Sequence, residues 1–164
     1  MFKIRNTICA LGIMGILTFI LFIVAAQAQE PIDCLVCQNI TMTPVFESKD
    51  LTILGSDGKG IVIDNTASKF FDSSTCHIIG ITKVDKGKAS VNWIGKYMAP
   101  NDDFYVIEGS SVGTESQWKL IYGTGKFEGI TGSGKGERFT NGKPISPGTV
   151  QVCSKITGTY ELKK

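Results

Sequence analysis

Four cysteines follow residue 28 of this 164-residue chain, and their thiols could form disulfides, bind a metal or act as nucleophiles. The apolar N-terminus indicates export, and an even number of cysteines in an exported domain predicts two disulfides. A bridge that closes a loop of a hundred residues or more contributes about 4 to 5 kcal/mol in the loop-entropy model, whereas a Cys34–Cys37 bridge restrains little. We therefore expect Cys34 and Cys37 to pair with Cys76 and Cys153, in an order that the sequence leaves open.

The Cys34-Leu-Val-Cys37 motif also admits redox, haem and zinc interpretations. A redox pair usually lies in a thioredoxin-like βαβ unit, which is missing from this sequence. Gln38 stands where a covalent haem motif needs a histidine, and the four thiols lack the paired Cys-x-x-Cys spacing of a zinc site. The sequence therefore predicts no metal and no cofactor.

The remaining polar candidates are His77, Glu108 and Glu128. His77 is the only histidine, which excludes catalysis by two histidines, and no G-x-S-x-G motif supplies a hydrolase nucleophile. His77 lies in an apolar segment, where packed structural histidines are common, and the two glutamates lie at predicted strand ends. These three residues form a candidate polar site, and no catalytic residue is assigned.

Aromatic side chains are the candidates for binding an apolar ligand. On alternating strands they either line a cavity or fill the interior of a small barrel, and filling is the commoner outcome. The candidates are Trp93, Tyr97, Phe104, Tyr105 and Trp118.

Strands must position these residues, because no dozen residues beyond the N-terminal segment show helical apolar spacing without Gly or Pro. In residues 88–98 and 152–162, apolar and polar side chains alternate with the period of two of a half-buried strand. Cys153 falls on the polar face of the last strand and is expected to point outward. Further strands are predicted at 45–53, 60–63, 76–84, 103–108, 117–123 and 126–139.

Turn sequences separate these segments, among them Ser56-Asp57-Gly58, Asp85-Lys86-Gly87 and Ser146-Pro147-Gly148. About eight short strands without a crossover helix favour an all-β fold, and closure into an antiparallel barrel removes exposed edges. We predict an eight-stranded closed barrel over residues 44–164, with residues 29–43 as an arm held against its outside by disulfides.

The segment Gly123-Thr-Gly-Lys-Phe-Glu-Gly129, followed by Gly132, lacks the hydroxyl residue and the helix of a phosphate-binding loop. Its glycines allow a strand to coil sharply, with Phe127 and Ile130 as packing side chains. This segment and the last strand resemble the allene oxide cyclase-like barrel superfamily, which includes plant cyclases and dirigent proteins. The resemblance implies an eight-stranded barrel, often with an apolar cavity open at one end, and carries over no catalytic residue.

Residues 1–28 read as an export signal: Lys3 and Arg5 precede twenty uncharged residues, and Ala26-Gln-Ala28 provides a cleavage site. An uncleaved membrane anchor is the alternative. Without this segment the 17 basic and 15 acidic residues become 15 and 15. A neutral chain with scattered lysines is an unlikely nucleic-acid binder.

These observations favour an exported, periplasmic or secreted, non-catalytic barrel that binds a small apolar ligand or an envelope or extracellular partner. A cyclase-like or isomerase-like enzyme that acts through cavity shape is one alternative, and a fully packed structural or interaction module is another. The sequence leaves open the oligomeric state, and also whether the sequon at Asn39 is glycosylated.

Overall fold

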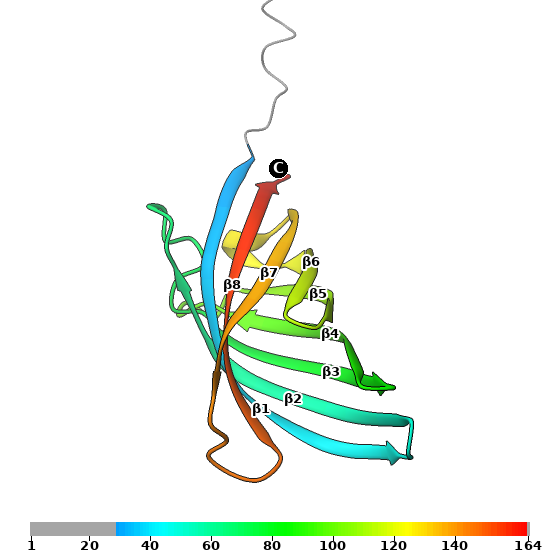
Figure 1. The fold of residues 1–164 in the computed structure, drawn as a ribbon. Coiled ribbons are helices and arrows are strands. Elements are labelled where there is room, and N and C mark those ends of the chain that lie inside the picture. The colour runs from blue at the N-terminus through cyan, green and yellow to red at the C-terminus, as the bar shows by residue number, and fades with distance from the viewer. Residues whose placement is uncertain (1–28, 164) are drawn as a thin grey trace, which may run out of the picture.

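The computed structural model describes residues 29–163, which form a closed antiparallel barrel of eight strands (Figure 1). Each strand pairs with the next along the chain, and the last pairs with the first. This confirms the predicted barrel. The strands are β1 (Glu30–Glu47), β2 (Leu51–Asp64), β3 (Thr75–Asp85), β4 (Lys88–Met98), β5 (Phe104–Val112), β6 (Glu115–Gly123), β7 (Ile130–Gly142) and β8 (Thr149–Leu162).

The segment predicted as an N-terminal arm is instead β1, paired on one side with β2 and on the other with β8. Ile32, Cys34 and Val36 point into the core, but Leu35 on the other face obscures the alternation in the sequence. The β1–β2 turn lies within the predicted strand 45–53, and the predicted turn at Ser56 lies inside β2. Both predictions were wrong because hydrogen bonding between β1 and β2, rather than local turn propensity, determines where these two long strands begin and end.

The predicted export signal at residues 1–28 lies outside the described residues. From residue 29 to 163, no helix has the length and apolarity needed to cross a membrane.

One end of the barrel is filled by aromatic rings from two connections. The β2–β3 connection contributes Phe70 and Phe71, and the short 3₁₀ turn η2 (Gly125–Phe127) contributes Phe127. The Phe70 ring stacks on Tyr160 of β8 with centroids 4.9 Å apart, and the Phe127 ring lies 4.7 Å from that of Tyr105. We call these five side chains the aromatic plug. Phe127 is fully buried, as is nearly all of Ile130, so both predicted packing residues lie in the core.

Tryptophans and glycines alternate along a row of paired residues across β4 to β7. Trp93 pairs with Gly109, Gly109 with Trp118, and Trp118 with Gly134. A Cβ atom on Gly134 would lie 2.6 Å from Cζ2 of Trp118 and would also overlap the carbonyl oxygen of Thr157. The glycines of the Gly-rich segment therefore make room for an indole ring and for the adjacent backbone.

Replacing Gly134 by alanine should lower the free energy of unfolding by about 1–3 kcal/mol, because the backbone oxygen of Thr157 in the ladder cannot move aside cheaply. Urea denaturation measures the change. Gly55→Ala is the matched control, since a Cβ atom there meets nothing closer than 3.8 Å. Equal stability of the two variants would contradict the tight packing of Trp118 over β7.

The first and last strands are joined covalently by a disulfide between Cys37 of β1 and Cys153 of β8. The two residues face each other in the ladder, with Cα atoms 4.1 Å apart, and Val152 beside them points inward. The disulfide therefore lies on the outer face, as predicted for Cys153. It closes the barrel at the seam between residues 116 positions apart in the sequence.

Candidate functional site

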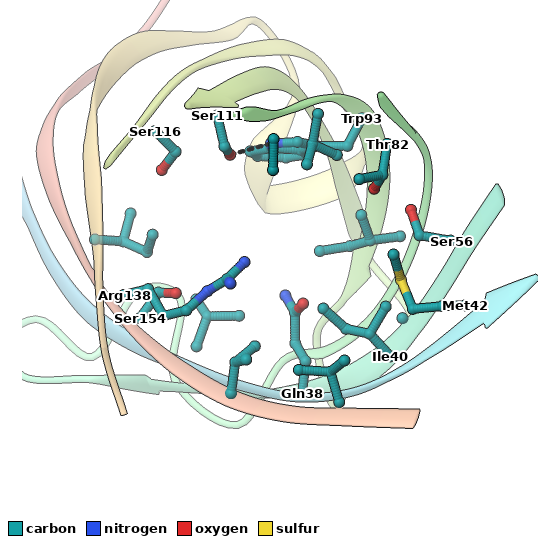
Figure 2. Close-up of a pocket in the computed structure, with 18 of the residues that line it drawn as sticks. Gln38, Ile40, Met42, Ser56, Thr82, Trp93, Ser111, Ser116, Arg138 and Ser154 are labelled. Atoms are coloured by element: carbon teal, nitrogen blue, oxygen red, sulfur yellow. Dashed lines mark hydrogen bonds between the residues drawn. The ribbon is translucent and has the colours of Figure 1, made fainter. Parts of the chain in front are cut away.

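A cavity of about 220 Å³ lies at the end of the barrel opposite the aromatic plug (Figure 2). Its walls come from the ends of the strands that meet in the β1–β2, β3–β4, β5–β6 and β7–β8 hairpins. Apolar side chains make much of the wall, among them Val36, Ile40, Ile78, Val91, Trp93 and Ile156. The chain thus forms a barrel that is packed at one end and hollow at the other.

Tyr97 separates the cavity from the packed half. Its ring lines the cavity and stacks on Tyr105 beneath it, with centroids 5.0 Å apart and nearly parallel planes. Burial raises the pKa of the Tyr97 phenol well above its usual value, so this group stays protonated and neutral. Below Tyr97, a void of only about 30 Å³ remains among the core side chains.

Small polar groups interrupt the apolar wall. The indole Nε1 of Trp93 donates a hydrogen bond to Ser111 Oγ at 3.3 Å, which satisfies the indole and fixes the ring against the wall. Gln38 of β1 and Arg138 of β7 extend toward the middle of the space (Figure 2). The cavity therefore combines apolar surface with a small number of convergent polar groups, the usual composition of a ligand site.

Arg138 reaches the cavity through the regular alternation of β7, immediately before an irregularity in the strand. The pairing with β8 shifts register between Arg138 and Thr140, a β-bulge that leaves Phe139 without a partner. Ser154 of β8 is the cross-strand partner of Arg138 and lines the same cavity.

The predicted aromatic residues separate into three groups. Trp93 and Tyr97 line the cavity, and Tyr105 and Trp118 are buried in the packed half. Phe104 was wrongly predicted to face inward: its ring lies outside, under the Lys96 ammonium at 4.2 Å. The physical reason is alternation, because Tyr105 takes the inward position and its neighbour must face the other way.

The predicted polar site of His77, Glu108 and Glu128 does not form. His77 Nε2 lies 3.2 Å from the carboxylate of Asp57 on the outer surface, with half of the side chain exposed. Glu108 pairs with Lys119 at 2.7 Å, also outside, and Glu128 is exposed in the β6–β7 connection. Successive side chains of a strand point to opposite faces. Cys76 takes the inward position beside His77, and Gly109 takes it beside Glu108, so both predicted polar residues face outward.

The second predicted disulfide is absent, because Cys34 and Cys76 are free thiols buried inside the barrel. Burial, with Asp64 nearby, raises the pKa of Cys34 to about 12, and burial raises that of Cys76 to about 11. Neither thiol is a thiolate near neutral pH, so neither is an activated nucleophile. Cys34 and Cys37 point to opposite faces of β1, which also excludes the redox pairing of this motif.

Sequence reasoning missed Arg138 and Gln38 as site residues. A usable signal existed, because Arg138 is the only arginine after Arg5 and shares the period-two face of Gly134 and Gly136 in β7. Gln38 follows Val36 by two residues, but the absence of a recognised strand there hid its direction.

No protein-family model matches this sequence, and a search of curated proteins finds no match. Solved structures of two pterocarpan synthase dirigent proteins are similar to the chain, each with 13% sequence identity. GePTS1 has a TM-score of 0.48, with 83% of this chain and 94% of that chain covered. PsPTS1 has a TM-score of 0.46, with 79% and 96% covered. A relation to the allene oxide cyclases stays a prediction.

Proposed function

We propose that the protein is a non-catalytic barrel that holds a small apolar molecule in the cavity opposite the aromatic plug. The observation that carries the proposal is the cavity itself, which has mainly apolar walls built from four hairpins and a floor formed by Tyr97. Burial of apolar ligand surface there would supply about 25 cal/mol per Å² as a driving force. Export, which the N-terminal segment and the Cys37–Cys153 disulfide support, is part of the same proposal.

The cavity wall favours binding over the cyclase-like alternative. Arg138 could stabilise developing negative charge, but a cyclase-like reaction also needs a group that moves a proton, and a glutamate or a histidine is the usual choice. Among the cavity-lining residues of the described chain there is neither.

Filling the cavity should abolish binding of a neutral apolar probe. In Val91→Phe the larger ring enters the cavity, and we expect the affinity for 1-octanol to fall at least about tenfold, a loss of about 1.4 kcal/mol. Titration followed by tryptophan fluorescence measures it, with Trp93 in the wall as the reporter. The control is Asn92→Phe, which adds the same ring to the exposed face of the same strand.

Saturable octanol binding that Val91→Phe removes and Asn92→Phe preserves is the expected result. If neither octanol nor its carboxylate analogue octanoate binds saturably to the unaltered protein, the proposal is overturned and the packed interaction module remains. One observation favours that second candidate: 220 Å³ lies below the range of about 300–1,000 Å³ typical of small-molecule pockets. Ile79, Ile81 and Ile94, which are about half exposed on β3 and β4, would then be candidate contact residues.

A further inference from the structure

Arg138 is the one charged side chain among the residues that line the cavity within the described chain. No ion pair or side-chain hydrogen bond joins its guanidinium to another of residues 29–163, whose ion pairs use His77 or lysines. No aspartate or glutamate faces it across the cavity. The structure therefore directs a permanent positive charge into a space with mainly apolar walls and provides no protein anion to balance it.

The orientation of Arg138 runs against the usual preference of its segment. Lys135 and Glu137 of β7 are exposed on the outer face, as charged residues usually are, and Arg138 alternates to the inside. The next residue, Phe139, is 56% exposed outside the barrel. An inward arginine beside an outward phenylalanine inverts the usual burial order, and such local conflicts are expected at functional sites.

A half-buried guanidinium in apolar surroundings gains most from a bound anion. Its planar fork of N–H groups matches a carboxylate, with two parallel charge-assisted hydrogen bonds. The amide of Gln38 extends into the same part of the cavity, and the hydroxyl of Ser154 lies across the ladder from Arg138 (Figure 2). Both add neutral hydrogen-bonding groups around one cation. A single unopposed charge suits a monoanion, since a second negative charge would have no counterpart in the wall.

We propose that the ligand of this barrel is an amphipathic carboxylate, whose headgroup binds the Arg138 guanidinium and whose apolar part lies against Ile40, Val91 and Trp93. The inference rests on the proposed binding function and deepens it by assigning the ligand class and the anchoring residue. The apolar wall supplies affinity for the body of the ligand, and Arg138 supplies the selectivity for its charge.

The test compares octanoate with 1-octanol, which share the chain length and differ in the headgroup, in titrations that follow tryptophan fluorescence. We expect octanoate to bind the unaltered protein at least about tenfold more tightly than octanol, as a charge-assisted pair implies. Arg138→Gln should remove this difference, because octanoate then loses its charge-assisted partner. Arg138→Lys should retain part of the difference in affinity, because lysine keeps the positive charge but lacks the planar, two-pronged N–H donors of the guanidinium. Acetate, the headgroup alone, should bind at least about tenfold more weakly than octanoate.

Lys135→Gln is the control variant, because it removes one positive charge from the same strand at an exposed, outward position. It should bind octanoate as the unaltered protein does. Equal affinity for octanoate and octanol, or octanoate binding that survives Arg138→Gln, overturns the anchoring role and leaves the binding function intact. Failure of both probes to bind overturns the two proposals together. A thermal denaturation curve of Arg138→Gln that matches the unaltered protein shows that the loss comes from the headgroup contact.

Discussion

Phe127→Ala should lower the free energy of unfolding by about 3–5 kcal/mol, which is within the range measured for large aromatic truncations in protein cores. Phe127 is fully buried. Its ring lies within 4.7 to 5.9 Å, centroid to centroid, of Tyr105, Phe70 and Phe71. Because these partners come from the β2–β3 connection and from β5, removal of the ring leaves a cavity that no single segment can fill. Urea denaturation gives the change directly.

Phe139→Ala provides the matched control, because it deletes the same side chain from an outward position that is 56% exposed. Its stability should change by no more than about 0.5 kcal/mol. The same pair of variants tests the division of the barrel into two halves. Phe127→Ala, measured well below its melting temperature, should still bind octanol, since the aromatic plug lies on the far side of Tyr97 from the cavity. A loss below about 1 kcal/mol for Phe127→Ala would contradict the role of the plug as the core of the closed end.

Removal of the seam disulfide by the double variant Cys37→Ala, Cys153→Ala should cost about 2–5 kcal/mol. The bridge joins residues 116 positions apart, so in the loop-entropy model it restricts nearly the whole unfolded domain. It also connects the first and last strands, whose pairing is the most non-local step in closing the barrel. Both side chains are only partly buried, so little packing is lost with the sulfur atoms.

Reductant supplies the internal control for this prediction. Dithiothreitol should destabilise the unaltered protein by the same amount and leave the double variant unchanged. Peptide mapping without reduction should recover a peptide bridged from Cys37 to Cys153, with Cys34 and Cys76 as free thiols. A map in which Cys34 is bridged to Cys37 or to Cys76 would show that this assignment of the thiols is wrong.

The closed end and the seam explain how a cavity persists in a small barrel. Burial of apolar side chains is concentrated below Tyr97, where the aromatic plug and Trp118 fill the interior. The end that holds the cavity contributes fewer fully buried residues. Its shape depends on the hydrogen-bonded strand ladder, in which the Cys37–Cys153 disulfide links β1 to β8. Stability thus comes mainly from one half of the molecule, and the other half is left open for a ligand.

Local pattern in the sequence determined the fold class and much of the strand arrangement. Alternation with a period of two in residues 88–98 and 152–162 correctly placed Trp93 and Tyr97 on one face and Cys153 on the other, because successive side chains of a strand must point to opposite faces. The turn at Asp85-Lys86-Gly87 was correct because positive backbone angles at residues 86 and 87 are a local requirement.

Tertiary structure alone decided which side chains meet. Whether Cys37 or Cys34 reaches Cys153 depends on the register between β1 and β8, which no local segment encodes. Arg138 lies on one face of β7 by alternation, and only closure of the barrel makes that face the wall of a cavity without an acidic partner. His77 and Glu108 are excluded from the interior by the same closure, because it makes one face of each strand the inside. Strand periodicity is a property of neighbours in sequence, whereas register and closure depend on contacts between distant residues, and these created the candidate site.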